Sequence, residues 1–204
     1  MSNTIGIIDY DCGNIRSVIN AIEYHQYNIK MVSHPSQLAE VSKIILPGVG
    51  AFDPAMQSLE KLDFVEALKN WVGIDSHKLL GICLGMQLLC NISEESLEAR
   101  KGLGFIDADV RLLTSSIECR LPNMGWSEVE FCTNEWDCFN GDYYFVHSYG
   151  VFCKNDSSIL AKSTYGDTSF ASGITNGVNI TGFQFHPEKS HYLGLSLIED
   201  FLKK

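Results

Sequence analysis

Residues 79–89 constrain the fold more than any other part of the sequence. The stretch begins as a short apolar run, passes through Gly-Ile-Cys-Leu-Gly at 81–85, and continues in a helical pattern. Glycines at this turn let a strand and a helix approach closely, and they allow Cys83 a strained backbone conformation. A reactive side chain at such a turn is a nucleophile elbow, where helix N–H groups favour thiolate. The pattern predicts a nucleophilic Cys83, with a buried structural cysteine as the alternative.

A thiolate nucleophile needs a base, and the base needs an orienting group. The alternating stretch 178–185 predicts a strand, and His186 follows directly at its C-terminal end. Pro187 ends the strand, and Glu188 can point back at the imidazole and hold one tautomer. We therefore predict a Cys83–His186–Glu188 triad. His147 also ends a predicted strand, but it lacks a carboxylate two residues later and is the second choice of base.

Length and charge narrow the class of protein. The 204 residues suit one domain spanning 1–204, and the net charge of −10 argues against a nucleic-acid-binding surface. No apolar run is long enough for a membrane span, and the start lacks the features of a signal peptide, so a cytoplasmic protein without membrane contact is expected. Seven cysteines without a Cys-x-x-Cys pair disfavour a disulfide framework and a zinc site. We expect no metal and no other cofactor.

Hydrophobic periodicity divides the chain into two halves. The first predicts strands at 4–9, 29–32, 43–46 and 78–83, alternating with helices at 14–27, 38–41, 52–62 and 64–72, of which the last two are separate helices or one bent helix. This order implies a parallel sheet with helices on both faces. The second half predicts short, mainly antiparallel strands at 110–113, 126–131, 143–151, 159–162, 170–175 and 178–185, and a closing amphipathic helix. The class is therefore α/β, with antiparallel strands that extend the sheet.

The sequence resembles the class I, or triad, glutamine amidotransferase family. Gly-Ile-Cys-Leu-Gly-Met-Gln at 81–87 and Phe-His-Pro-Glu at 185–188 carry this resemblance. Further matches are Leu-Pro-Gly-Val-Gly-Ala-Phe at 46–52, Ser-Glu-Glu at 93–95, Met-Gly-Trp at 124–126, Phe-Val-His-Ser-Tyr at 145–149 and Glu-Lys-Ser at 188–190. The stretches at 47–52 and 146–149 resemble one subfamily, the glutaminase subunits of histidine biosynthesis.

The resemblance implies a flavodoxin-like fold with a central, mostly parallel sheet. It also implies that the chain hydrolyses glutamine and passes ammonia to a separate (β/α)8-barrel cyclase, or synthase, subunit in a heterodimer. Attack on an amide creates an oxyanion that needs aimed N–H donors. The loop at 47–50 and the residue after the nucleophile could supply them, so Val49, Gly50 and Leu84 are the candidates. An ordinary glycine-rich turn is the alternative reading of that loop.

The glutamine substrate also needs groups that hold its ammonium, carboxylate and stem. Glu95 could bind the ammonium, and Gln87 lies one helical turn from Cys83 on the same face. By resemblance, the glutamine pocket comprises Gly48, Gln87, Glu95, His147, Ser148 and Tyr149. The alternative for 93–95 is a solvated helix end.

The partner is expected to cover the sheet edge that carries the catalytic loops. By resemblance, Asn14, Trp126 and Lys189 form this interface, with Trp126 placed in a Met-Gly-Trp turn. The chain departs from the usual subfamily pattern at Asn123, Ser127 and His191, where histidine, asparagine and glutamine are common. These departures leave open a paralogous subunit that supplies ammonia for sugar amidination in surface-polysaccharide synthesis. A stand-alone γ-glutamyl hydrolase and a non-catalytic binding subunit are further alternatives.

Overall fold

The structure, a computed structural model, describes residues 4–11, 15–114 and 119–204. Its first half is a parallel sheet in the strand order β2-β1-β3-β4. The strands are β1 (Thr4–Ile8), β2 (Asn28–Val32), β3 (Lys43–Gly48) and β4 (Lys78–Cys83). The connections contain α1 (Ile15–Tyr24), the 3-10 helix η1 (Pro35–Glu40), α2 (Phe52–Lys61) and α3 (Phe64–Val72). The predicted alternation of strands and helices in this half is confirmed.

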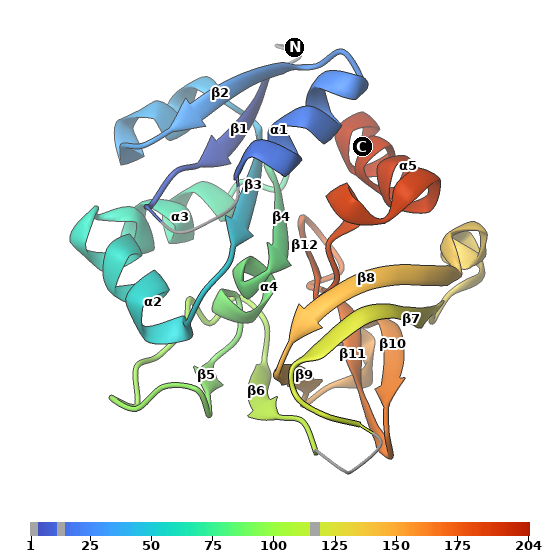
Figure 1. Ribbon diagram of the computed structural model, residues 1–204. Helices are drawn as coiled ribbons and strands as arrows, with labels where there is room; N and C mark the ends of the chain where they lie inside the picture. Colours follow the sequence, from blue (N-terminus) through green and yellow to red (C-terminus); the bar gives the residue numbers. More distant parts are fainter. Residues whose placement is uncertain (1–3, 12–14, 115–118) are drawn as a thin grey trace.

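The second half continues the same sheet with mostly antiparallel strands, in the order β4-β12-β11-β10-β7-β8 (Figure 1). The strands are β5 (Ile92–Ser93), β6 (Ala108–Leu112), β7 (Asn123–Phe131), β8 (Gly141–His147), β9 (Tyr149–Cys153), β10 (Ile159–Tyr165), β11 (Thr168–Thr175) and β12 (Ile180–Phe183). The helical segments are α4 (Leu84–Leu88), η2 (Asn134–Phe139), η3 (Asp156–Ser158), η4 (Pro187–Lys189) and α5 (His191–Lys203). The sheet is therefore mixed, as the two halves of the sequence predicted.

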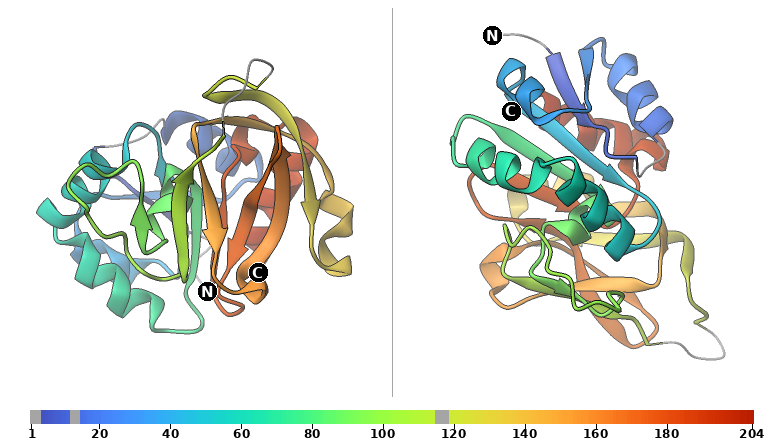
Figure 2. Two further views of the ribbon diagram at one scale, coloured as in Figure 1. Left: turned by 90° about the horizontal axis from the view of Figure 1, so that it is seen from below. Right: turned by 90° about the vertical axis from the view of Figure 1, so that its left-hand side faces the viewer.

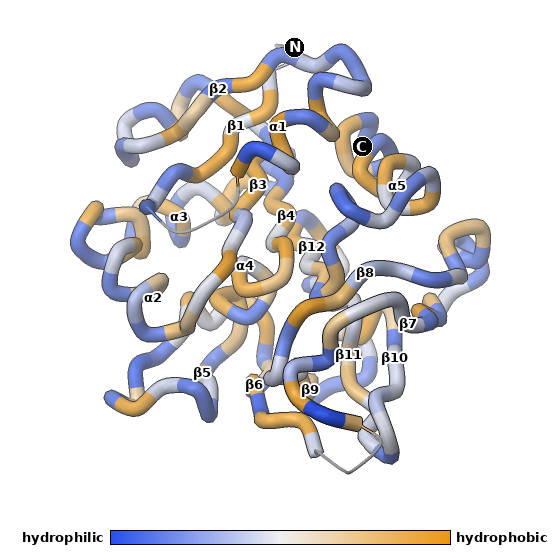
Figure 3. The backbone as a smooth tube through the Cα atoms, viewed as in Figure 1, coloured by the Kyte–Doolittle hydropathy of each residue, from blue (hydrophilic) through white to orange (hydrophobic). Residues whose placement is uncertain are grey.

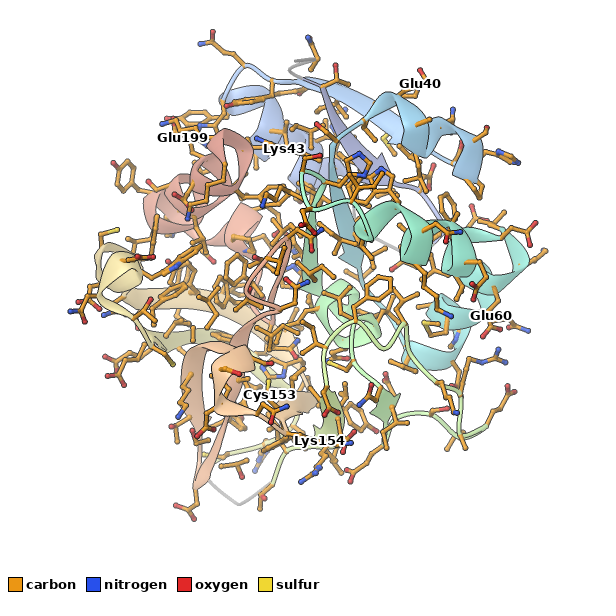
Figure 4. All side chains as sticks on the ribbon, turned by 180° about the vertical axis from the view of Figure 1, so that it is seen from behind. Glu40, Lys43, Glu60, Cys153, Lys154 and Glu199 are labelled. Carbon is orange, nitrogen blue, oxygen red and sulfur yellow. The ribbon has the colours of Figure 1, made fainter. Side chains whose placement is uncertain are left out.

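Helices cover the parallel strands on both faces (Figure 2). Alternate residues of a strand point to opposite faces, so Ile7 of β1 packs with α1 and α5, while Ile8 packs with α2 and α3. Each helix buries one apolar side against the sheet; on α1 this side includes Val18 and Ile22. In Figure 3 the strands at the centre are accordingly more hydrophobic than the outer loops. Charged side chains such as Glu40, Glu60 and Glu199 lie at the periphery (Figure 4).

The pairing of β4 decides where the elbow lies. This strand pairs in parallel with β3 on one side and β12 on the other, with Cys83 beside Gly48 and Ile82 beside Phe183. Because parallel strands end at the same edge, the loop after β3, the elbow after β4 and the segment after β12 meet there. The chain thus brings residues near 48, 83 and 186 together at the C-terminal edge of the sheet.

Three local predictions were wrong. The Met-Gly-Trp segment is not a turn, because strand β7 begins at Asn123 and already includes it; the strand predicted at 126–131 is the second part of β7. The stretch 143–151 is two strands, because the chain breaks at Ser148 to let β9 pair with β6 and β11 instead of β7. The strand predicted at 178–185 ends at Phe183. Beyond Phe183 the chain is bonded to neighbouring strands of the described ranges only through two isolated backbone bonds, from Gln184 N to Ser172 O and from His186 N to Tyr144 O.

Candidate active site

Cys83 lies at a strained turn between β4 and the short helix α4. Its backbone has φ 53° and ψ −112°, a conformation that residues with a Cβ rarely adopt. Such strain persists only where the surrounding structure enforces it. A Cβ built on Gly85 would lie 1.9 Å from the carbonyl oxygen of Leu46 on β3, so only glycine fits there. The close packing of α4 on β3 therefore holds the cysteine in the elbow geometry.

The loop after β3 is pressed against this elbow. A Cβ on Gly48 would meet the backbone nitrogen of Gly85 at 2.6 Å, which explains why glycine occupies this position. The buried Tyr10 donates a hydrogen bond from its hydroxyl to the Pro47 carbonyl at 2.7 Å and fixes the base of the loop. Beyond this anchor, Val49 and Gly50 are exposed, and Gly50 has φ 103°. The loop thus presents its peptide groups beside Cys83.

His186 and Glu188 form a buried pair next to Cys83. Nδ1 of His186 lies 2.8 Å from Oε1 of Glu188, and both side chains are 3% exposed. Because a carboxylate only accepts hydrogen bonds, Nδ1 is the donor and Nε2 is left for the cysteine. Nε2 of His186 has no hydrogen-bond partner within the described part of the chain. The nitrogen that a catalytic base needs is therefore unoccupied by any other described group.

The charge state of His186 follows from this environment. Burial lowers the pKa of His186, but its interactions with the Cys83 sulfur and the Glu188 carboxylate raise it by more, to about 9. The imidazole therefore holds a proton at neutral pH. A proton held there can be given to a departing amine, which is the task of a general acid.

A cavity of about 280 Å³ opens over the sulfur of Cys83. Its wall contains nearly all residues that were predicted to bind substrate or stabilise an oxyanion. The lining residues are Val49, Gly50, Cys83, Leu84, Gln87, Glu95, Pro122, Val146, His147, Ser148, Tyr149 and His186. Gly48 lies beneath the elbow and Glu188 behind His186, so these two do not line it. The size and the mixed lining suit a small polar ligand.

Two of the predicted substrate-binding side chains are engaged in internal hydrogen bonds. Nε2 of Gln87 donates to the Tyr149 carbonyl at 3.0 Å and to Oε1 of Gln184 at 2.9 Å. His147 contacts the same Tyr149 carbonyl through Nδ1 at 2.8 Å, and its Nε2 lies 3.2 Å from Nδ2 of Asn123. Both residues therefore shape the cavity wall and hold β9 in place.

Glu95 joins the cavity to the start of helix α2. Its Oε2 accepts a hydrogen bond of 2.8 Å from the backbone N–H of Phe52, the first residue of that helix. Burial raises the pKa of Glu95, although the Phe52 bond opposes this shift. The carboxylate is thus a helix cap as well as the acidic group of the cavity, next to the loop at 47–51.

The rival base His147 has the opposite charge behaviour to His186. Burial lowers the pKa of His147, the Tyr149 hydrogen bond opposes this effect and the charge of His186 adds to it, so that the pKa is about 4. His147 is therefore neutral at physiological pH, with its proton on Nδ1 facing a carbonyl. A ring with its proton fixed in this way is a poor general base.

Of the predicted interface residues, Trp126 and Lys189 both contact Tyr144. The Trp126 ring packs edge-on against Tyr144, and Nζ of Lys189 lies 5.9 Å from the centre of the Tyr144 ring. Trp126 also stacks on His191 at 4.8 Å between ring centres and remains 46% exposed. Asn14, the third predicted residue, lies outside the described residues.

Sequence reasoning missed several residues around the sulfur. Nε2 of Gln184 donates to Sγ of Cys83 at 3.8 Å, and the Val146 carbonyl lies 4.0 Å from the same sulfur. Pro122 lines the cavity, and the neighbouring Asn123 lies behind it against Nε2 of His147. Gln184 had a sequence signal, because it is a polar residue between two aromatic residues in a buried stretch. Asn123 was noticed only as a departure from a pattern.

The geometry defines a class of enzyme: an α/β protein that catalyses hydrolysis or group transfer with a cysteine at a strand-to-helix elbow and a buried His–Glu pair beside it. No metal-binding cluster occurs within the described ranges, and no helix there is long and apolar enough to cross a membrane. The sequence model of the family "Glutamine amidotransferase class-I" matches residues 7–204. The chain belongs to this family and is an enzyme of the glutamine amidotransferase class.

Curated relatives are similar along almost the whole chain. An imidazole glycerol phosphate synthase subunit HisH 2 of Methanococcus maripaludis is 41% identical, with 98% of this chain and 99% of that protein covered. Subunit HisH 1 of Campylobacter jejuni is 40% identical with the same coverage. A crystal structure of a glutamine amidotransferase shares the fold with a TM-score of 0.78 at 19% identity, covering 98% of this chain and 97% of the other.

Proposed function

We propose that this chain is the glutaminase subunit of an imidazole glycerol phosphate synthase, a single domain over residues 1–204. It hydrolyses glutamine to glutamate and ammonia and passes the ammonia to a (β/α)8-barrel cyclase subunit in histidine biosynthesis. The observation that carries the proposal is the cavity in which Cys83 faces the buried His186–Glu188 pair. The similarity to named synthase subunits over the full length supports the choice of pathway.

The first chemical step is attack of the Cys83 sulfur on the side-chain carboxamide of glutamine. The carbonyl oxygen becomes an oxyanion, for which the backbone N–H groups of Leu84 and of the Val49–Gly50 loop are the donors. His186 carries the proton, consistent with its pKa of about 9, and transfers it from Nε2 to the leaving nitrogen. Ammonia departs, and a γ-glutamyl thioester remains on Cys83.

The second step is hydrolysis of this thioester. His186 has lost its proton to ammonia, so its Nε2 can now accept one from an attacking water molecule. The tetrahedral intermediate collapses, the bond between carbon and the Cys83 sulfur breaks, and glutamate leaves. Cys83 is then a thiolate again beside the protonated His186. Throughout, Glu188 accepts the Nδ1–H bond and keeps Nε2 directed at the cysteine. Glu95 is the acidic group of the cavity that suits the α-ammonium of glutamine.

A second candidate shares the glutaminase chemistry but supplies ammonia to another acceptor, in sugar amidination. The observation that favours it is the departure of Asn123 and His191 from the usual pattern. Asn123 contacts His147 of the cavity wall, and His191 stacks on the exposed Trp126. The numbered names HisH 2 and HisH 1 of two relatives also indicate more than one such subunit in their organisms.

Complementation separates these candidates. The gene for this chain is placed in a histidine auxotroph that lacks only its own glutaminase subunit, with and without the cyclase gene from the same source. Growth without histidine when the matching cyclase is present supports the synthase. Failure to grow, while the purified chain hydrolyses glutamine with another barrel partner, supports the paralogue.

A further inference from the structure

The buried side chain of Gln184 lies directly behind the sulfur of Cys83. It is 0% exposed, and its Nε2 donates to Sγ at 3.8 Å. We propose that Gln184 is a thiolate-stabilising residue of this active site, which keeps an amide N–H aimed at the Cys83 sulfur as the proton leaves for His186. The proposal rests on the proposed glutaminase function of the site and adds a group that the triad does not include.

The orientation of the Gln184 amide is fixed by the groups behind it. An amide nitrogen and oxygen are hard to tell apart by shape, so the neighbours must decide. The Tyr149 carbonyl can only accept, which makes Nε2 of Gln87 its donor at 3.0 Å. The other hydrogen of that nitrogen meets Oε1 of Gln184 at 2.9 Å. Only Nε2 of Gln184 is then left for the sulfur.

The neutral form of His147 supports this orientation of the Gln87 and Gln184 amides. His147 also donates its Nδ1–H to the Tyr149 carbonyl at 2.8 Å, and Asn123 faces its other nitrogen. A neutral His147 with the proton on Nδ1 holds the carbonyl as an acceptor from two donors. Nε2 of Gln87 therefore donates in two directions, to the Tyr149 carbonyl and to Oε1 of Gln184, and Nε2 of Gln184 in turn donates to Cys83.

The other contacts of the sulfur explain why a donor is needed. The Val146 carbonyl, 4.0 Å away, accepts from the thiol but repels a thiolate. The helix that begins after Cys83 has only five residues, so fewer peptide dipoles add up than in a long helix. A hydrogen bond to a charged group is stronger than one to a neutral group. The Gln184 N–H thus favours the thiolate over the thiol.

The test is the pH dependence of Cys83 alkylation by iodoacetamide in the isolated, full-length chain. Cys132 and Cys138 are exposed and also react, so the modified Cys83 peptide is measured by mass spectrometry. Gln184→Met keeps a similar volume but has no donor, and the midpoint of alkylation should rise by about one pH unit. Gln184→Leu also lacks a donor, and its midpoint should rise by a similar amount.

Ser172→Ala is the matched control. Ser172 lies opposite Gln184 on the adjacent strand and is equally buried, but its hydroxyl has no partner among the described residues. Its midpoint should equal that of the unmodified chain. Circular dichroism and thermal unfolding identify variants that are folded, and Gln184→Leu decides the matter if Gln184→Met is not. Unchanged midpoints in the folded Gln184 variants, or an equal rise in Ser172→Ala, would overturn the proposal.

Alkylation needs neither glutamine nor a partner subunit, so this result is independent of the proposed function. A shifted midpoint in a chain that hydrolyses no glutamine, even with its partner, would leave the role of Gln184 standing and refute the glutaminase. Full glutamine hydrolysis with an unshifted alkylation midpoint would support the glutaminase and refute the role of Gln184.

Discussion

Two buried histidines line the same cavity and hold protons over different pH ranges. The pKa of His186 is raised to about 9 by its neighbours Cys83 and Glu188 against the effect of burial, and that of His147 is lowered to about 4 by burial. The difference lies in the groups that each imidazole faces. His186 faces a carboxylate and a sulfur that favour the charged ring, whereas His147 faces a carbonyl and an amide in an apolar surrounding. One cavity thus holds a charged and a neutral imidazole side by side.

These shifts predict a stability maximum close to pH 6.5, the ordinary pKa of histidine. A group whose pKa is raised on folding stabilises the folded state at pH values below its unfolded pKa. The contribution of His186 to stability is therefore lost as pH rises toward 9. A group whose pKa is lowered on folding stabilises the folded state at pH values above its unfolded pKa. The contribution of His147 to stability is therefore lost as pH falls toward 4. Urea unfolding against pH should show both limbs. His186→Gln should flatten the basic limb and His147→Gln the acidic one; a basic limb that is the same in His186→Gln contradicts the assignment.

Glu95 should combine two separable roles. Glu95→Gln keeps an oxygen that can accept from the Phe52 N–H but removes the charge that suits an ammonium. We therefore expect it to raise KM for glutamine at least tenfold (about 1.4 kcal/mol) with little loss of stability. Glu95→Ala removes the cap as well and should lower the free energy of unfolding by about 1 kcal/mol. Steady-state glutaminase assays and urea unfolding measure these effects. An unchanged KM in Glu95→Gln would remove Glu95 from the substrate site.

At the scale of elements, the junction of β3, β4 and α4 fixes the nucleophile. Leu46 and Gly81 are register partners, and the helix that follows crosses directly over the Leu46 carbonyl. The elbow geometry is therefore a property of three packed elements and not of Cys83 alone. The register also places Gly48 beside Cys83, so the loop after β3 cannot move away from the elbow at its base.

Gly85→Ala tests this packing. Its Cβ would overlap the Leu46 carbonyl oxygen, and we expect a loss of about 3 kcal/mol of unfolding free energy together with loss of Cys83 reactivity. Gly73→Ala is the control, because Gly73 has helical φ and ψ of −65° and −7° and its Cβ would lie 3.3 Å from the nearest atom. It should change stability by less than about 1 kcal/mol. Equal effects of the two changes in urea unfolding would show that the close approach is not what holds the elbow.

The elements also show how far the sequence could predict the site. Gly-x-Cys-x-Gly and His-Pro-Glu predicted Cys83, His186 and Glu188 because each motif is local and its chemistry depends on few residues. The break at Ser148 could not be predicted, since it depends on which distant strands pair. Gln184 was overlooked for the same reason: its role depends on contacts with Gln87 and Cys83, far away in the chain.

At the scale of the whole molecule, Tyr144 links the catalytic His186 to the exposed Trp126. Tyr144 of β8 accepts a hydrogen bond from the His186 N–H and packs against Trp126 of β7. Met124 and Tyr192 near this position are also largely exposed. Ammonia released at Cys83 must avoid bulk water, where it would be trapped as ammonium. A synthase subunit docked on this face would close the route.

Variants on this face should uncouple the two subunits. Trp126→Ala should weaken affinity for the cyclase at least tenfold, because a half-exposed aromatic is a typical interface anchor. Lys189→Ala should reduce the salt-dependent association rate. Both should fold normally. Val178→Ala, an exposed residue next to the start of β12 at the opposite sheet edge, is the control. Binding measured by calorimetry or surface plasmon resonance should change only for the first two; unchanged affinity in both would place the docking face elsewhere.

The central claim is that Cys83 generates ammonia for a synthase that does not itself need the cysteine. The most direct measurement compares the complex of this chain with its cyclase, in the original form and as Cys83→Ala, using glutamine or an ammonium salt as nitrogen source. We predict that Cys83→Ala abolishes glutamine-dependent synthesis of imidazole glycerol phosphate and keeps the ammonia-dependent rate. Glutamine-dependent synthesis that persists in Cys83→Ala, or loss of both activities in a correctly assembled complex, would contradict the account.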